Sequence, residues 1–328
     1  MFIPDAQGGG VTLFTGSDGG VYKQHVAGGG DFSNDSWGDG LNTGINSQQA
    51  YDAEMSGDGT IVSGLQDNGE MKIVSPNSSA GDASREYEIY GGDAFFNTID
   101  PGNSSNILEE YTYGATSVTN DGGATWNTST NDCSSSNALF STPIEQDPTQ
   151  SGHVVLGCGT IDEAFPSTAT PIGAYNPYAC ADPTCQTTNN AWAPVFTLPA
   201  APSGAASIPS AVGVRGANVY IGYCGYCDTV TQGVPFANGI ATNVGGAAAP
   251  QEGTGNGWHI ASALCGGCNT ANGRLPERYI TSIQLDPSDP NTIYVTLGGY
   301  ARRWVAPGSL GDSTANAVSY THLRAHET

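Results

Sequence analysis

Positively charged residues are scarce in this sequence. Its 328 residues include 9 Lys and Arg against 31 Asp and Glu, which gives a net charge of -22. A surface of that sign repels the phosphates of nucleic acids and the headgroups of anionic lipids. We therefore expect no nucleic-acid partner. The acidity is interpreted chiefly as a means of keeping the protein soluble, and an acidic site for cations or basic ligands is the alternative.

Long apolar segments and targeting signals are also missing. No run approaches the roughly 20 apolar residues that cross a bilayer, so we expect no membrane insertion. The start, Met1 to Asp5, has neither the basic region nor the apolar core of a signal peptide. The closing segment, residues 319–328, resembles a translated sequencing-adapter tail, and we exclude it and its His322 and His326 from fold and metal-site reasoning. We accordingly expect a gene fragment in which Met1 can be an internal start.

Charged residues make up only 12% of the chain, whereas glycine occurs 46 times. This composition favours short strands joined by tight turns over long helices with charged faces. The sequence therefore predicts an all-β protein.

An apolar tetrad typical of a β-strand recurs six times. The first three spacings between copies match the 40 to 50 residues of a four-stranded propeller blade, and the last two fit blades with insertions. We predict a β-propeller of four-stranded antiparallel blades over residues 1–318, about six of them present and the ring incomplete. Asp-Pro turns precede three of the copies, where the Asp side chain can cap the turn. The tetrads begin at Thr12, Ile61, Ile107, Val154, Val219 and Ile293.

The segment from Thr119 to Trp126 reads T-N-D-G-G-A-T-W. It matches the Asp-box pattern at every defined position and resembles the BNR repeats of sialidase-, sortilin- and xyloglucanase-like propellers. That resemblance implies that side chains hold a tight hairpin, that Gly supplies a positive φ, and that Trp packs between blades. The residues concerned are Thr119, Asp121, Gly123, Thr125 and Trp126. Asp boxes lie away from the ligand face, so they indicate architecture and not activity.

Catalytic motifs are few. There is no Gly-x-Ser-x-Gly elbow for a serine hydrolase, and the Arg-Ile-Pro segment of sialidases is absent. The turn from Ser17 to Tyr22 resembles the Asp-x-Gly-Gly-x-Tyr turn that carries the general base of xyloglucanase-type hydrolases, which makes Asp18 the candidate catalytic residue. An inverting hydrolase also needs a second acid, which that family takes from a second propeller domain. Without that second acid, a turn role for Asp18 is favoured, and the catalytic role is the alternative.

Eight cysteines indicate an oxidising compartment. We predict disulfides between Cys133 and Cys158 and between Cys180 and Cys185. The remaining four pair within or across two C-x-x-C motifs, at Cys224 and Cys227 and at Cys265 and Cys268. A four-thiolate zinc site is the alternative for these motifs, although the 37 residues between them exceed the usual spacing. We expect no metal and no cofactor.

The longest predicted insertions, residues 160–210 and 225–280, are candidate ligand loops. Their aromatic side chains could stack on sugar rings or form small cores, the latter being favoured for Trp192 and Trp258. We therefore expect a secreted, extracellular or cell-surface binding or scaffold module for extracellular polysaccharide or protein. The alternatives are a xyloglucanase-like glycoside hydrolase using Asp18 and a structural cell-surface protein. Candidate ligand-face residues are Tyr175, Tyr178, Tyr223 and Tyr226.

Overall fold

The computed structural model describes residues 2–4, 9–17, 20–30, 49–74, 86–164, 177–178, 192–200, 206–224, 238–244, 257–261, 280–289, 292–297 and 320–324. In these ranges the chain is all β, with 22 strands and no α-helix. Within the same ranges, no helix is long and apolar enough to span a membrane. The all-β prediction is confirmed.

The chain divides into two compact units, Met1–Gln49 and Ala50–Thr328. The first contains one antiparallel sheet in the order β1-β2-β3, in which β2 and β3 form a hairpin. Its strands are β1 (Phe2–Pro4), β2 (Gly10–Ser17) and β3 (Gly20–Ala27).

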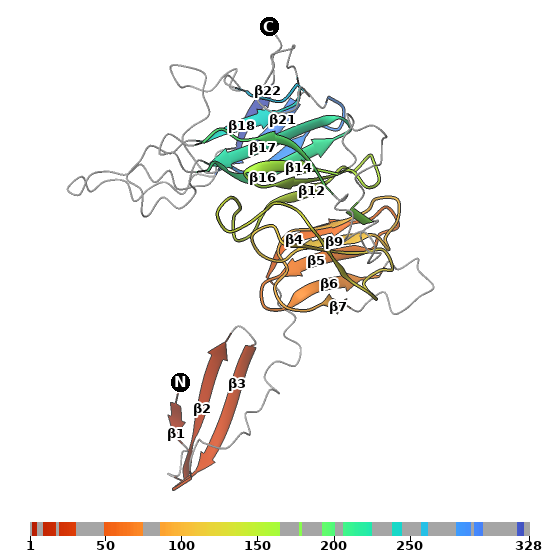
Figure 1. Ribbon diagram of the computed structural model, residues 1–328. Helices are drawn as coiled ribbons and strands as arrows, with labels where there is room; N and C mark the ends of the chain where they lie inside the picture. Colours follow the sequence, from red (N-terminus) through yellow and green to blue (C-terminus); the bar gives the residue numbers. More distant parts are fainter. Residues whose placement is uncertain are drawn as a thin grey trace, which may run out of the picture. The chain divides into compact units, whose positions relative to one another are not determined.

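The second unit contains five antiparallel sheets, each built from strands that follow one another in the chain. We call each sheet a blade and name it by its strands; Figure 1 shows the blades of this unit succeeding one another in chain order. Blade β4–β7 consists of β4 (Ala50–Met55), β5 (Ile61–Leu65), β6 (Gly69–Ile73) and β7 (Glu86–Tyr90). Blade β8–β11 consists of β8 (Asn97–Ile99), β9 (Ile107–Glu110), β10 (Thr116–Thr119) and β11 (Asn127–Ser129).

The remaining blades repeat this order. Blade β12–β15 consists of β12 (Ile144–Gln146), β13 (Val154–Gly157), β14 (Thr160–Glu163) and β15 (Ala193–Thr197). Blade β16–β19 consists of β16 (Ile208–Arg215), β17 (Asn218–Cys224), β18 (Asn238–Thr242) and β19 (His259–Ile260). Blade β20–β22 consists of β20 (Ile280–Leu285), β21 (Thr292–Leu297) and β22 (Tyr320–Arg324).

The first strand of each blade contacts the first strand of the next, from β4 through β8, β12 and β16 to β20. Consecutive four-stranded meanders that meet through their first strands form a β-propeller. Each of the six apolar tetrads lies in the second strand of its own sheet, so the tetrads correctly predicted where the sheets are.

Apolar side chains fill the interfaces between blades. The largest core lies between blades β12–β15 and β16–β19 and includes Val155, Ile221 and Trp258. A smaller one lies between blades β4–β7 and β8–β11, where Val62, Ile99 and Ile107 are the fully enclosed members. This small core leaves part of that interface to polar side chains.

The Asp-Pro turns are held as expected from the sequence. Asp100, Asp147 and Asp286 each accept the backbone N–H two residues on, at 2.8 Å in all three cases. Each proline lies between donor and acceptor, where its fixed φ favours the turn.

Part of the segment interpreted as a non-native tail forms a strand of blade β20–β22. Residues 320–324 form β22, which pairs antiparallel with β21 from Thr292↔Arg324 to Thr296↔Tyr320. The non-native origin of residues 319–328 stays a prediction.

Candidate ligand-binding face

Strand direction divides the turns of the second unit between two ends of its blades. In an antiparallel meander successive turns lie at opposite ends. The turns after β5 and β9 and the segments leading into β8 and β12 therefore share one end. The Asp-Pro turns and the turn at residues 120–126 lie at the other.

Exposed aromatic side chains gather at the first of these ends. We call this set the aromatic face; its members are Tyr51, Tyr111, Tyr113 and Phe140, which are between 37% and 47% exposed. They come from the start of β4, from the turn after β9 and from the segment before β12. Exposed aromatics of this number in one place are typical of a binding surface.

A buried ring supports the aromatic face. Phe95 is 0% exposed, and its ring centroid lies 4.8 Å from that of Tyr51 and 5.1 Å from that of Phe140, both edge-on. Phe140 in turn meets Tyr113 edge-on at 5.3 Å. The rings thus form one continuous chain of favourable edge-to-face contacts across two blades and the segment leading into a third.

The backbone is strained at two turns of this end. Asp67 (φ 63°) and Tyr113 (φ 54°) are the only non-glycine residues with positive φ in the part of the chain that the structure describes. Left-handed backbone at such residues costs about 1 kcal/mol or more and is enriched at functional sites. Both residues lie in turns after the second strand of adjacent blades, which marks these turns as a candidate site.

Polar groups border the aromatic face. Gln66, Asp67 and Asn68 are exposed in the turn after β5. Tyr51 Oη donates to Gln66 Oε1 at 2.9 Å, and Asp67 N donates to Asp93 Oδ1 at 2.9 Å. These contacts fix the turn against the neighbouring segment and place amide and carboxylate groups beside the rings.

A disulfide fastens the segment that carries Phe140. Cys133 and Cys158 are bonded, with their Cα atoms 5.7 Å apart, which is the pairing predicted from the sequence. Gly114 has φ +78° and packs so closely on both cysteines that a Cβ there would collide with Cys133. The disulfide therefore ties the segment before β12 to the Tyr113 turn and to the turn after β13.

Buried carboxyl groups lie under the aromatic face. Glu109 and Glu110 on β9 and Glu70 on β6 are all 0% exposed. Burial raises the pKa of Glu109 and of Glu110 to about 8, against a usual 4.5. Burial also raises the pKa of Glu70 strongly, and the nearby charges of Glu109 and Asp52 add to the effect. Glu110 Oε1 accepts the N–H of Gly114 at 2.9 Å, which partly opposes its shift.

A second set of carboxyl groups lies on the first strands. Burial raises the pKa of Glu54 to about 7, and the charge of Asp52 adds to this shift. Burial likewise raises the pKa of Asp52 and, strongly, that of Glu145 on β12, where Glu54 and Asp52 contribute further repulsion. These three side chains make the first strands of blades β4–β7 and β12–β15 locally acidic.

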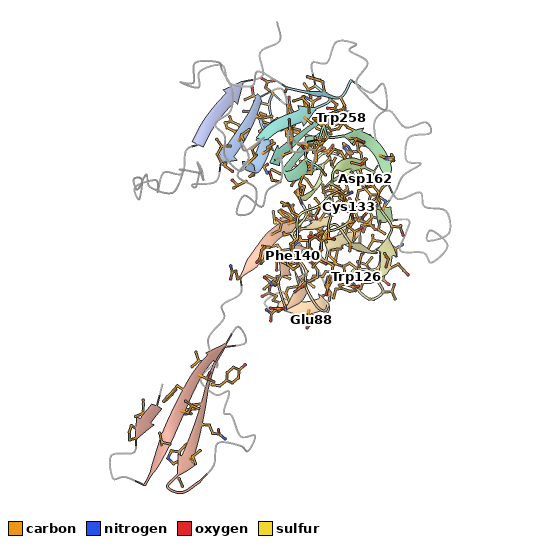
Figure 2. All side chains as sticks on the ribbon, turned by 60° about the vertical axis from the view of Figure 1, so that its left-hand side comes forward. Glu88, Trp126, Cys133, Phe140, Asp162 and Trp258 are labelled. Carbon is orange, nitrogen blue, oxygen red and sulfur yellow. A yellow bond between two sulfur atoms is a disulfide. The ribbon has the colours of Figure 1, made fainter. Side chains whose placement is uncertain are left out.

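One acidic pair lies beside the disulfide. Asp132, Cys133 and Asp162 place ligand atoms within 4.8 Å of one another. Burial and the Asp132 carboxylate together raise the pKa of Asp162. Cys133 has no thiolate to offer a metal, because its sulfur is bonded to Cys158. Figure 2 labels Cys133, Asp162 and Phe140 on the ribbon.

The predicted Asp-box residues hold the turn after β10, at the end opposite the aromatic face. Asp121 Oδ1 accepts Thr125 N at 2.9 Å and Thr119 Oγ1 at 2.7 Å, while its Oδ2 accepts Thr125 Oγ1 at 2.7 Å. Gly123 has φ +99°, and Trp126 Nε1 donates to Ile89 O of the neighbouring blade at 2.9 Å. Trp126, labelled in Figure 2, thereby links two blades.

Two predicted ligand-face residues are buried. Tyr178 is 4% exposed, and its Oη donates to Gln146 Oε1 at 2.9 Å and lies 3.3 Å from Thr98 Oγ1. Tyr223 is 8% exposed and belongs to a core that also contains Trp258. The structure therefore places both rings in the interior, where neither can stack on a ligand.

The other predicted site residues lie outside the described part of the chain, or their side chains do. Asp18, Tyr175, Tyr226, Cys180, Cys185, Cys227, Cys265 and Cys268 lie outside it, and Cys224 is described as part of β17 only by its backbone. Sequence reasoning missed the aromatic face itself. One signal was available, because the Gln-Asp-Asn-Gly turn at residues 66–69 and the Tyr-x-Tyr-Gly turn at residues 111–114 occupy equivalent positions in successive repeats.

Comparison with known proteins yields no family model and no curated protein that matches this sequence. Among solved structures, the chain is similar to an ancestral GH74 enzyme (15% identity, TM-score 0.46, covering 88% of this chain and 33% of that one). It is also similar to the GH74 xyloglucanase from Xanthomonas campestris (14% identity, TM-score 0.46, covering 90% of this chain and 41% of that one). A third similar structure is YCF48 from Cyanidioschyzon merolae (12% identity, TM-score 0.43, covering 90% of this chain and 78% of that one). The chain spans about a third to two fifths of the length of the two GH74 structures, and at these identities the likenesses assign it no activity.

Proposed function

We propose that this chain is an extracellular β-propeller module of the Asp-box type that binds carbohydrate through its aromatic face. The observation that carries the proposal is the chain of rings from Tyr51 to Tyr113, exposed at its ends and supported by Phe95. Rings held at fixed angles offer apolar faces to a sugar at a small entropic cost.

The polar border favours a carbohydrate over a protein partner. Gln66, Asn68 and Asp93 place amide and carboxylate groups next to the rings, and such groups can hydrogen-bond to sugar hydroxyls. The strained turns at Asp67 and Tyr113 and the disulfide at Cys133 pre-organise the surface. Pre-organisation of this kind reduces the entropy lost on binding.

Affinity electrophoresis in gels containing soluble polysaccharides, guided by a glycan array, tests the proposal. We expect Phe140→Ala and Tyr111→Ala each to weaken binding by about tenfold or more, as loss of an aromatic anchor does. The matched control is Tyr87→Ala, which removes an equally exposed tyrosine (44%) from β7. Equal retardation of all three variants, or binding to a protein partner alone, would contradict the proposal.

The hydrolase alternative needs two carboxyl groups on either side of a sugar. Inverting enzymes separate them by about 6.5–9.5 Å. The pair beside the aromatic face, Asp132 and Asp162, has carboxyl oxygens within 4.8 Å of each other, which is too close for that mechanism. Asp18, the predicted general base, lies outside the described residues. We favour the binding module because of the exposed rings of the aromatic face.

A further inference from the structure

The interface between blades β4–β7 and β8–β11 contains two facing rows of polar side chains. Strand pairing places Asp52, Gly64, Glu70 and Tyr90 side by side across the first blade. It places Asn97, Glu109 and Ser117 side by side across the second. We call these two rows the polar seam.

Hydrogen bonds join the ends of the two rows. At the inner end, Asn97 N donates to Asp52 Oδ2 at 3.2 Å and Asn97 Nδ2 to Asp52 O at 3.4 Å. At the outer end, Ser117 Oγ donates to Tyr90 Oη at 3.2 Å. The two rows therefore face each other, and the charge of Glu109 acts on Glu70 between these ends.

Buried acceptor oxygens line the middle of the polar seam. Both carboxylate oxygens of Glu70, both of Glu109 and Oδ1 of Asn97 are buried without a hydrogen-bond partner, and all three residues are 0% exposed. Ser117 Oγ donates to Tyr90 Oη at 3.2 Å, and its interaction with the Glu109 side chain offsets only part of the effect of burial on the pKa of that carboxyl. Lys72, two residues beyond Glu70 on β6, directs its ammonium group to the carbonyl of Gly122 at 3.0 Å.

A backbone carbonyl enters the same space. Phe95 O lies where a Cβ would stand at residue 64, so only glycine admits it between Asp52 and Glu70. Carboxylates, an amide oxygen and a backbone carbonyl are the hard ligands that calcium prefers, in the flexible arrangement that it tolerates. An uncompensated cluster of buried acceptors is strongly destabilising, whereas a divalent cation compensates all of them at once.

We propose that the polar seam is a calcium site, with Glu70, Glu109, Asn97 Oδ1 and Phe95 O as its ligands. The cation adds to the small apolar core that Val62, Ile99 and Ile107 form at this interface. It also fixes the backbone of Phe95, whose ring supports Tyr51 and Phe140. Calcium thereby stabilises the aromatic face, and only this last step rests on the proposed function.

Thermal unfolding of the full chain, stripped with EDTA and then titrated with CaCl₂, measures the site without reference to carbohydrate. At a free Ca²⁺ concentration about a hundredfold above Kd, we expect Tm to rise by about 5 °C. We expect the rise to be lost in Glu70→Gln/Glu109→Gln, which keeps the shape of the side chains and removes both charges. The matched control is Glu88→Gln on the exposed edge strand β7, labelled in Figure 2, which should keep the full rise.

Terbium luminescence locates the ion. Tyr90 belongs to the seam and its ring lies 4.8 Å from that of Trp126, so Tb³⁺ bound there should be sensitised, and Ca²⁺ should quench the emission by displacement. The two carboxyl groups could instead be held protonated. In that case Ca²⁺ leaves Tm unchanged and the double Gln variant is at least as stable as the wild type, a result that would overturn the proposal. If the wild type shows the rise in Tm with Ca²⁺ but is not retarded by any carbohydrate, only the proposed function is overturned.

Discussion

At the scale of single residues, His153 has the most unusual environment. It is 1% exposed, and its ring nitrogens lie 3.0 Å from Asp147 Oδ2 and 2.8 Å from Glu163 Oε1. Burial alone would lower its pKa, but the two carboxylates outweigh burial and raise the pKa to about 9. The imidazole is therefore charged at neutral pH and ties the Asp-Pro turn at Asp147 to β14.

This environment predicts a specific pH dependence. The folded pKa lies above the unfolded value of 6.5, so the stabilisation by His153 is fully present below pH 6.5 and is lost as pH rises through about 9. The rise in the pKa of His153 corresponds to about 3 kcal/mol of stabilisation. Urea unfolding at pH 6 to 10 should show a steeper loss of stability in the wild type than in His153→Gln, because the buried glutamates contribute to the loss in both proteins and His153 contributes only in the wild type. His259→Gln, on β19, is the control, and an identical slope in both histidine variants would disprove the role.

Residues also differ in how readily the sequence reveals them. Asp121 was predictable because its partners Thr119 and Thr125 lie within four positions. Glu70 was not. Strand β6 reads G-E-M-K-I, an alternation typical of an edge that turns Glu and Lys to solvent, yet Glu70 is 0% and Lys72 9% exposed. The blade packed against that face decides the burial, and that contact is invisible in the local pattern.

At the scale of elements, the turn after β10 is a self-contained unit. Asp121 accepts three hydrogen bonds within the turn, which positions Trp126 to bond to Ile89 of the preceding blade. These hydrogen bonds stabilise the carboxylate and lower the pKa of Asp121 to about 2, against the opposing effect of burial. A local hydrogen-bonded turn is thus connected to packing between blades.

Removal of that carboxylate should loosen both the turn and the blade contact. We expect Asp121→Ala to lower the free energy of unfolding by about 2 kcal/mol, the cost of several lost hydrogen bonds in an exposed turn. Urea denaturation measures the loss, and Trp126 fluorescence should shift toward that of an exposed indole. Asn120→Ala, at the exposed neighbouring position, should change neither quantity. A wild-type fluorescence spectrum in Asp121→Ala would show that the turn does not position Trp126.

Elements also explain why the tetrads were found and the aromatic face was not. Each tetrad is the second strand of its sheet, a central strand with apolar side chains on both faces. Such strands are recognisable from composition alone. The aromatic face combines the start of one blade, a turn of the next and a segment leading into a third, from Tyr51 to Phe140. Its assembly depends on the order of the blades, and each contributing turn looks ordinary by itself.

At the scale of the whole molecule, most of the shifted acids shift in one direction. Glu54, Glu109 and Glu110 have pKa values raised by burial to between about 7 and about 8, and burial raises those of Glu70 and Glu145 as well. In the folded protein these groups bind protons that the unfolded chain releases above pH 4.5. Stability contributed by such groups is fully present below pH 4.5 and is lost as pH rises through 7 to 8.

The second unit should therefore be most stable in mild acid. Between pH 5 and pH 9, in EDTA so that no cation competes for the carboxyl groups, we expect the free energy of unfolding to fall by at least about 5 kcal/mol, the value for one glutamate whose pKa is raised from 4.5 to about 8. Below pH 4 stability should fall again, because the pKa values of Asp121 and Asp147 are lowered and their hydrogen bonds need the ionised form.

Calorimetry across this range measures the profile, and Glu109→Gln/Glu110→Gln separates its causes. The double variant retains Oε1 at residue 110 to accept the N–H of Gly114, and it cannot ionise at either position. Its stability should therefore vary much less than that of the wild type between pH 5 and pH 9. An unchanged profile would mean that Glu109 and Glu110 do not govern the response to pH.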